Sequence, residues 1–335
     1  MQRNQLQQFE QLEERRLMAV MAAAVNGDLT LSGTADAAVE IVATGSTTFD
    51  VFEGGELVAS LTGIDDDIRI NLDQVHDSSG DVEQELSLQL EGANVDRIIA
   101  RFGDGPNRLV LESGEIRGGL QYFGGAGDDS LEIEEDFVIG RGLLAFLGDG
   151  DNSFEMRGSV QRSLTVHAGD GDDLFDFSDS SALGLGVNIR AGDGDNQLAL
   201  AGGIEGSLSY RGGDGEDLID LLATSAIEGR ATFWLGDGDN SLSVEGSVGS
   251  QLRVSAGSGD DSVLIGQLAN LSQKARMRLG SGDNVVAPVG EESARLPVAA
   301  STDVEAEMAV VVELAAQLRQ LLRSGFEFHG SANLT

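Results

Sequence analysis

Apolar and polar positions alternate along most of the chain in short stretches, and these stretches recur about every 22 residues. One set follows a glycine-rich phrase, as in Leu131 and Ile133, and a second set precedes the next phrase, as in Leu164 and Val166. A spacing of two is the pattern of a β-strand with one buried face. Each unit therefore predicts two strands, and no stretch with the period of a helix lies between them.

The glycine-rich phrase has five residues and occurs nine times. Its first glycines are 22, 23, 21, 23, 21, 23, 21 and 23 residues apart. Glycine permits the positive φ angles of tight turns, and acidic residues also favour turns. A fixed period of this length is typical of a solenoid. The nine copies begin at Gly103, Gly125, Gly148, Gly169, Gly192, Gly213, Gly236, Gly257 and Gly280, and they end alternately in asparagine and aspartate.

These features predict an all-β fold, a parallel β-solenoid of the β-helix or β-roll kind. A coil of about 22 residues would contain a turn, a strand, a middle bend and a strand, with all nine turns on one edge. A coil of 44 residues, one full pair of repeats, would place the aspartate turns on one edge and the asparagine turns on the other. The shorter coil is favoured because the longer one needs faces of about 16 to 18 residues, well beyond ordinary strand lengths.

The pattern divides the chain into five segments. Residues 1–25 place arginines before a short apolar run and are expected to be an export or targeting segment, with an amphipathic helix as the alternative. Residues 26–102 alternate less regularly and are expected to form degenerate coils that cover the N-terminal end of the regular repeats, 103–287. Residues 288–301 contain two prolines and are expected to be a linker. Residues 302–335 start with a capping box and are expected to form a helix that caps the last coil, or that docks a partner.

Composition narrows the classes of function. The chain has no cysteine, so neither disulfides nor thiolate ligands are expected. Its net charge is −36 and Lys274 is its only lysine, which argues against a nucleic-acid partner because phosphate binding needs clustered basic residues. No apolar run reaches the about 18 residues of a transmembrane helix, so no membrane span is expected. This composition agrees with a secreted or cell-surface protein.

Two turns match a known motif over its full length. Gly124-Gly-Ala-Gly-Asp-Asp129-Ser-Leu131 and Gly212-Gly-Asp-Gly-Glu-Asp217-Leu-Ile219 have the form Gly-Gly-x-Gly-x-Asp-x-apolar. On these residues, and over roughly 103–287, the chain resembles the RTX, or haemolysin-type, calcium-binding repeat proteins. The resemblance implies a parallel β-roll in an exported bacterial protein, with Ca²⁺ bound by backbone carbonyls and by the aspartate that ends the motif. The aspartates in that position are Asp129, Asp173, Asp217 and Asp261.

The N-terminal segment carries a second resemblance. Its phrase Phe9-Glu-Gln-Leu-Glu-Glu-Arg-Arg-Leu-Met-Ala19 resembles the LEPR-type motif found at the start of long, repetitive exported proteins of some bacteria. Glu14 stands where that motif has proline. The resemblance implies export from the cell.

Electrostatics favours a bound cation independently of the family resemblance. The nine turns carry 18 acidic residues, and at about 5 Å between coils two such charges repel by roughly 0.8 kcal/mol in water. Ca²⁺ accepts oxygen ligands in flexible geometry, whereas transition metals prefer histidine or cysteine. The alternative is that glycine and aspartate serve only as turn formers and that the asparagines stack as a neutral ladder. The candidate calcium ligands are Asp128, Asp129, Asp149, Asp151, Asp170, Asp172, Asp173, Asp193, Asp195, Asp214, Glu216, Asp217, Asp237, Asp239, Asp260, Asp261 and Asp283.

A second column of residues lies two positions before each turn glycine, with a parity opposite to that of the core. Its members are Arg101, Phe123, Phe146, His167, Arg190, Arg211, Trp234, Ser255 and Arg278. Stacked on the outside, they would form a strip that binds a glycan or another anionic polymer through rings and bidentate arginines. The alternative is an exposed face whose arginines pair with neighbouring carboxylates. The candidate binding strip is His167, Arg190, Arg211 and Trp234.

Catalysis has little support, because no metalloprotease, nucleophilic-serine or phosphate-loop motif occurs. A polysaccharide lyase or hydrolase that uses Arg190, Arg211 and Asp176 or Asp220 is the enzymatic alternative. The sequence therefore predicts an exported, calcium-binding β-solenoid with a structural or adhesive role at the cell surface or in the extracellular matrix. Its expected partners are Ca²⁺ and either extracellular polysaccharide or other surface proteins. The alternative function is a β-helix that binds or cleaves glycans.

Overall fold

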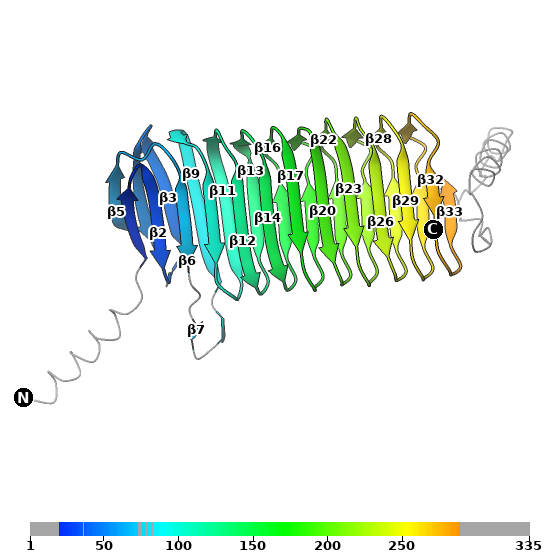
Figure 1. The fold of residues 1–335 in the computed structure, drawn as a ribbon, viewed down its shortest axis with the longest axis horizontal. Coiled ribbons are helices and arrows are strands. Elements are labelled where there is room, and N and C mark those ends of the chain that lie inside the picture. The colour runs from blue at the N-terminus through cyan, green and yellow to red at the C-terminus, as the bar shows by residue number, and fades with distance from the viewer. Residues whose placement is uncertain (1–19, 36, 73–75, 78–79, 82, 289–335) are drawn as a thin grey trace, which may run out of the picture.

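The computed structural model describes residues 20–35, 37–72, 76–77, 80–81 and 83–288, and this part of the chain is an elongated parallel β-solenoid (Figure 1). The prediction of an all-β fold is confirmed, since the described residues contain strands and turns but no helix. Register partners in the regular repeats are 21 to 23 residues apart, as in Phe123 with Phe146 and Phe146 with His167. The shorter of the two coil lengths is therefore the one found, with all the turns on one edge.

Sheet A is formed by the strand that precedes each turn. Its strands are parallel except for the first pair, which is antiparallel. In spatial order they are β1 (Met21–Val25), β2 (Asp28–Gly33), β6 (Ile68–Leu72), β10 (Ile98–Phe102), β12 (Leu120–Ala126), β14 (Leu143–Asp149), β17 (Ser163–Ala168), β20 (Gly186–Gly192), β23 (Ser207–Gly212), β26 (Ala231–Gly236), β29 (Leu252–Ala256) and β32 (Arg276–Arg278).

Sheet B is formed by the strand that follows each turn, and a ladder of two-residue strands, the bend ladder, continues it after the middle bend. The strands of sheet B are β5 (Glu56–Thr62), β4 (Thr48–Glu53), β3 (Val39–Gly45), β9 (Gln84–Val95), β11 (Asn107–Ile116), β13 (Ser130–Ile139), β15 (Ser153–Met156), β18 (Leu174–Phe177), β21 (Gln197–Leu200), β24 (Leu218–Leu221), β27 (Ser241–Val244), β30 (Ser262–Ile265) and β33 (Val285–Pro288). The bend ladder runs from the end of β13 through β16 (Ser159–Val160), β19 (Ala182–Leu183), β22 (Gly203–Ile204), β25 (Ala226–Ile227), β28 (Ser247–Val248) and β31 (Asn270–Leu271).

One continuous apolar core fills the inside of the coils. The inward side chains of sheet B stack one per coil, as Leu131, Phe154, Phe175 and Leu198 do through neighbouring strands. All four are buried and belong to the same core cluster. Since the chain has no disulfide, stacking of neighbouring coils is what holds the solenoid together.

The N-terminal end contains antiparallel hairpins beside strands that continue the parallel pairing, as β2 with β6 and β3 with β9 do. Strands β1 and β2 form one hairpin around Asn26 and Gly27, which have φ angles of 54° and 92°. Strands β3, β4 and β5 form an antiparallel meander, with Gly54 and Gly55 in its second turn. Asn-Gly and Gly-Gly are strong hairpin signals because their residues tolerate positive φ. A further two-residue hairpin, β7 (His76–Asp77) with β8 (Gly80–Asp81), projects from the solenoid (Figure 1).

Several expectations concern residues outside the described part of the chain. They are the export segment over 1–19, the linker beyond 288 and the C-terminal helix from 302. The last residues assigned to the export segment, Met21–Val25, form β1 and pair with β2. No described helix is long and apolar enough to cross a membrane.

Candidate functional site

The turns of the regular repeats present two acidic positions outward and one position inward. The second and fourth residues of the five-residue phrase are exposed, and the fifth is buried. The exposed acids are Asp104, Asp149, Asp170, Asp193, Asp214 and Asp237 at the second position, and Asp128, Asp151, Asp172, Asp195, Glu216, Asp239, Asp260 and Asp283 at the fourth. The predicted metal ligands thus fall into an outer set and an inner set, which have different surroundings.

The outer carboxylates bind backbone amides of the next coil. The N–H of Asp151 donates to Oδ1 of Asp128 over 2.9 Å, and the N–H of Asp172 donates to Oδ1 of Asp151 over 2.8 Å. At the second position the N–H of Ser258 donates to Asp237, and hydrogen bonds from Ser258 lower the pKa of that carboxyl group. These amides offset part of the repulsion between stacked charges while leaving the second oxygen of each carboxylate on the outer side of the bond.

The fifth positions form one mixed column in which asparagine and aspartate alternate inside the solenoid. Its described members are Asn107, Asp129, Asn152, Asp173, Asn196, Asp217, Asn240, Asp261 and Asn284, each at most 2% exposed. From Asp129 onward, each side chain accepts the backbone N–H of the preceding member. For example, Asn152 donates to Oδ1 of Asp173 over 3.0 Å, and Asp173 donates to Oδ1 of Asn196 over 3.1 Å. The column, here called the inner ladder, therefore links every coil to the next.

The side-chain amides of the asparagines donate hydrogen bonds to oxygens of the turns. Nδ2 of Asn152 donates to the carbonyl oxygens of Gly148 and Gly150 in its own turn, at 3.1 and 2.8 Å, and to Oδ1 of Asp173 at 2.9 Å. Asn196 makes the same three contacts one pair of coils later. Nδ2 of Asn240 contacts two such oxygens and Nδ2 of Asn284 one. The asparagine side chains thus place N–H donors among the carbonyl and carboxylate oxygens of the turns.

Each aspartate of the inner ladder has a hydrogen-bond partner for only one of its two carboxylate oxygens. Oδ2 of Asp129, Asp173, Asp217 and Asp261 is buried and has no hydrogen-bond partner among the described residues. Burial raises the pKa of Asp129 and of Asp173 to about 7 and that of Asp217 to about 6, although hydrogen bonds from the preceding asparagine oppose the shift. A buried carboxylate oxygen without a partner is costly, so a proton or a cation is favoured at each of these positions.

Two of the four aspartate turns have a tyrosine and a glycine beside the carboxylate. Tyr210 and Gly212 precede the turn of Asp217, and a Cβ atom on Gly212 would overlap Oδ2 of Asp217. Burial, and then the charge of Asp217, raise the pKa of Tyr210 well above its ordinary value. Tyr122 and Gly124 stand in the same relation to Asp129. At the other two aspartate turns the same positions hold valine and alanine.

The inward direction of the inner ladder was missed by the sequence reasoning, although a signal for it exists. Asp129 lies two residues before Leu131 and four before Ile133, so all three share the parity of the buried face. On its type and motif position this residue is expected to be a calcium ligand, which assigns it no direction relative to the core. Parity predicts that the fifth turn residue points into the core.

Within the described ranges, the one group of three acidic side chains whose ligand atoms all lie within 4.8 Å of one another is not at the regular turns. It consists of Asp28, Asp66 and Asp67 near the N-terminal end. Asp67 is fully buried and paired with Arg97 at 2.8 Å and with Arg69 at 3.0 Å. Two arginines thus already compensate this group, which makes it a structural ion-pair cluster.

The predicted outer strip exists as a continuous column on sheet A. Its members are register partners from Arg101 through Phe123, Phe146 and onward to Arg278. The rings of Phe123 and Phe146 stack at 5.4 Å, and those of Phe146 and His167 at 5.0 Å. Burial, and then the nearby Arg190, lower the pKa of His167. The N-terminal half of the strip therefore stacks on itself, and its C-terminal half is made of arginines around Trp234.

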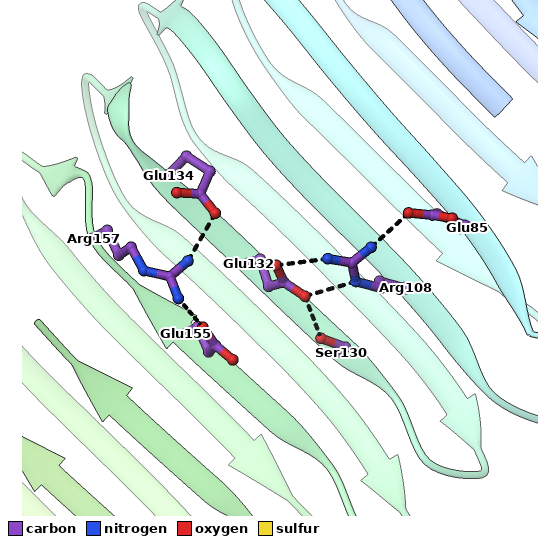
Figure 2. Close-up of polar contacts among 7 residues, drawn as sticks. All are labelled: Glu85, Arg108, Ser130, Glu132, Glu134, Glu155 and Arg157. Carbon is purple, nitrogen blue, oxygen red and sulfur yellow. Dashed lines mark hydrogen bonds and ion pairs between the residues drawn. The ribbon is translucent and has the colours of Figure 1, made fainter. Parts of the chain in front are cut away.

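An acidic groove lies on the outer face of sheet B, at its N-terminal end. Its volume is about 650 Å³, and its lining includes seven acidic residues and a single arginine, Arg108. Arg108 bridges Glu85 at 2.5 Å and Glu132 at 2.7 Å, and Arg157 joins Glu134 to Glu155 beside it (Figure 2). Burial opposes the charge of Glu132, but the contacts with Arg108 outweigh it and lower the pKa of Glu132. Three of the seven lining acids, Glu85, Glu132 and Glu134, are thus paired with the two arginines.

The residues named for an enzymatic alternative do not come from one surface. Arg190 and Arg211 lie on sheet A, in β20 and β23, whereas Asp176 and Asp220 lie on sheet B, in β18 and β24. Comparison of the chain with models of known families, with curated proteins and with solved structures finds no match.

Proposed function

We propose that this protein is an exported, calcium-stabilised β-solenoid with a structural or adhesive role at the cell surface or in the extracellular matrix. The observation that carries the calcium part is the row of four buried carboxylate oxygens without a partner, one at every second coil. The asparagine turns satisfy the same column with an amide that binds carbonyl and carboxylate oxygens. An aspartate has no N–H to offer there, so a cation is the group that completes its turns.

The donor set favours Ca²⁺ over other metals. All candidate ligands are carboxylate or carbonyl oxygens, and the chain has no cysteine and only three histidines. Ca²⁺ tolerates the irregular coordination that backbone carbonyls and one or two carboxylates provide, whereas Mg²⁺ requires near-octahedral order. Asp129, Asp173, Asp217 and Asp261 would supply the inner oxygens, and the exposed turn acids would supply the outer ones.

Calorimetric titration of the full chain with Ca²⁺, together with thermal melts, tests this proposal. A ligand that binds only the native state stabilises it by about 2.7 kcal/mol at a hundredfold excess over Kd. We expect a higher Tm in several millimolar Ca²⁺ than in chelator at matched ionic strength, and a smaller effect of Mg²⁺. An identical Tm in chelator and in Ca²⁺ would remove the basis of the proposal.

The structural or adhesive role follows from the shape and the surface of the molecule. Figure 1 shows a rod of stacked coils with long outer faces, a form suited to spacing or to repeated contacts along one direction. The motif near the N-terminus supports export. Antibody labelling of intact and of lysed cells tests the location, and labelling that requires lysis would contradict it.

A further inference from the structure

The outer face of sheet A is basic, although the protein as a whole has a net charge of −36. The ten parallel strands from β6 to β32 contain seven arginines and one acidic residue, Asp149, which lies at the turn end of β14. The acids are gathered at the turn edge and on sheet B instead. The part of sheet A considered below, the basic face, consists of Arg190, Arg211, Arg230, Trp234, Arg253, Arg276 and Arg278.

The arginines of the basic face lack carboxylate partners. In the part of the chain that the structure describes, ion pairs within 4.0 Å involve Arg69, Arg97, Arg108 and Arg157, none of which belongs to this face. Two pairs of its arginines are instead register neighbours in adjacent strands: Arg190 with Arg211, and Arg253 with Arg276. Like charges side by side destabilise a sheet. Stability of the fold therefore does not account for this arrangement.

A groove lies in the basic face, over β26, β29 and β32. It has a volume of about 340 Å³ and lies between Trp234 and Arg278, where the intervening strip residue is the small Ser255. Trp234 is 41% exposed, and the guanidinium group of Arg211 lies 5.2 Å from its ring centroid. Arg230, Arg253 and Arg276 complete the rim. Nε of Arg253 donates to Oε1 of Gln251 over 2.7 Å, but among the described residues no arginine of the rim is paired with a carboxylate. The groove thus combines one exposed aromatic wall with several guanidinium groups that lack a carboxylate partner.

We propose that the basic face binds an anionic polysaccharide, a glycan chain that carries carboxylate or sulfate groups. Guanidinium groups bind such anions through paired N–H donors, and an indole ring provides an apolar wall for a sugar ring. A glycan chain along the solenoid axis meets a new coil about every 4.8 Å. The basic face is narrow and borders the edge of acidic turns. The carboxylates of that edge would repel a wide polyanion such as duplex DNA. This identifies the ligand of the adhesive role proposed above and rests on that role, but it does not depend on calcium.

Trp234 is the only tryptophan in the chain, so its fluorescence reports directly on the basic face. The full chain is titrated in chelator with polygalacturonate, with chondroitin sulfate, with neutral dextran and with duplex DNA. We expect a saturable change in Trp234 emission with at least one of the two acidic glycans and none with dextran. Binding of polygalacturonate would show that carboxylates suffice, whereas binding of chondroitin sulfate alone would indicate that sulfate groups are needed, because chondroitin sulfate carries both groups.

Paired variants test the residues. Arg253→Gln with Arg278→Gln removes two guanidinium groups from the groove, and we expect the Kd for the acidic glycan to rise about tenfold or more because charge-assisted hydrogen bonds are lost. Arg141→Gln with Arg162→Gln is the matched control, since it removes the same charge from exposed positions before the strands of sheet A. Its Kd should stay within about twofold of the original. Far-UV circular dichroism and thermal melts establish that both variants are folded.

Three results would overturn the proposal. They are no response to either acidic glycan, an equal loss of affinity in the two double variants, and binding of DNA as tight as binding of the glycans. If titration with Ca²⁺ produced no heat and Ca²⁺ did not raise the Tm, only the calcium proposal would be contradicted. Glycan binding is measured in chelator and does not depend on that result.

Discussion

The side-chain amide of Asn152 lies 2.9 Å from Oδ1 of Asp173 in the next coil and donates a hydrogen bond to it. The backbone N–H of Asn152 donates to the same oxygen over 3.0 Å, while Oδ2 of Asp173 is buried without a partner. One oxygen of the carboxylate is therefore used twice and the other not at all. This imbalance recurs at every second coil, and the predictions below depend on what completes it.

Replacing aspartates of the inner ladder by asparagine should separate cation binding from folding. In Asp173→Asn with Asp217→Asn, the new amides can donate to the glycine carbonyls of their own turns, as Nδ2 of Asn196 does at 2.9 Å. We expect the variant to gain about 1 kcal/mol or more per site in chelator, because a buried unpartnered group is removed. Its Ca²⁺ affinity should fall while its strand content is unchanged. Denaturation in chelator and calorimetric titration measure the two effects, and a loss of stability in chelator would contradict the half-satisfied ladder.

Removing asparagines from the ladder should have the opposite effect. In Asn196→Ala with Asn240→Ala, the turn carbonyls lose an amide donor and Asp217 and Asp261 lose a side-chain hydrogen bond. We expect a loss of about 1–3 kcal/mol per site, of similar size in chelator and in Ca²⁺. Thermal melts in both conditions test this. If the two double variants lost Ca²⁺ affinity equally, asparagine and aspartate turns would not differ in function.

The inner ladder should also give the protein an unusual pH dependence. Burial raises the pKa of Asp129 and Asp173 to about 7 and of Asp217 to about 6. The native state then binds more protons than the unfolded state between about pH 4 and pH 7, so these groups favour folding at low pH and lose that contribution as pH rises through 6 to 7. In chelator we expect a higher Tm at pH 5 than at pH 8, and saturating Ca²⁺ should reduce the difference.

The control for this pH dependence is the Asp173→Asn with Asp217→Asn variant. General repulsion among the acidic residues weakens at low pH in both proteins, so only the difference between them isolates the ladder. We expect a smaller gain in Tm between pH 8 and pH 5 for the variant. An equal change in Tm with pH in the two proteins would show that the inner aspartates keep ordinary pKa values.

The repeat architecture could be predicted from the sequence because it depends on local periodicity. Burial of one face requires apolar residues two apart, as in Leu131 and Ile133, and the spacing of the turns sets the coil length. The environment of Asp129 was harder to predict, since its residue type indicates a cation ligand while its parity matches the core. The lack of a carboxylate partner for Arg190 and Arg211 could not be predicted. It depends on which face each acidic residue takes in the folded coil, and no local pattern reports that.

The ion pairs around Arg108 should contribute modestly to stability. Arg108 contacts Glu85 and Glu132, and the side chain of Glu132 is 13% exposed. We expect Arg108→Met to cost about 1 kcal/mol at pH 7 and less in high salt, because Arg108 itself is partly exposed. The pKa of Glu132 is lowered in the native state, so this contribution is present above the ordinary glutamate range and is lost as pH falls. Urea denaturation at pH 7 and pH 3 checks this, and an equal cost at both pH values would exclude an electrostatic origin.

The last prediction concerns the two forms of the aspartate turn. Tyr210 with Gly212 surrounds Asp217, whereas valine and alanine hold the equivalent positions, 166 and 168, beside Asp173. A Cβ atom on Gly212 would overlap Oδ2 of Asp217 and lie 2.6 Å from the backbone oxygen of Leu235, so Gly212→Ala alone should cost about 1–3 kcal/mol through overpacking. Tyr210→Val alone should cost about 2–4 kcal/mol, because it leaves a cavity in a fully buried site.

The double variant Tyr210→Val with Gly212→Ala should cost less than the sum of the two. The smaller valine leaves room for the carboxylate of Asp217 to move away from position 212, which gives the combination already present at 166 and 168. Coupling between such neighbours is typically about 0.5–3 kcal/mol. Urea denaturation of the two single variants and the double variant, all in chelator, measures this coupling. Additive free energies would show that tyrosine and glycine are accommodated independently, and that the four aspartate turns do not come in two alternative packings.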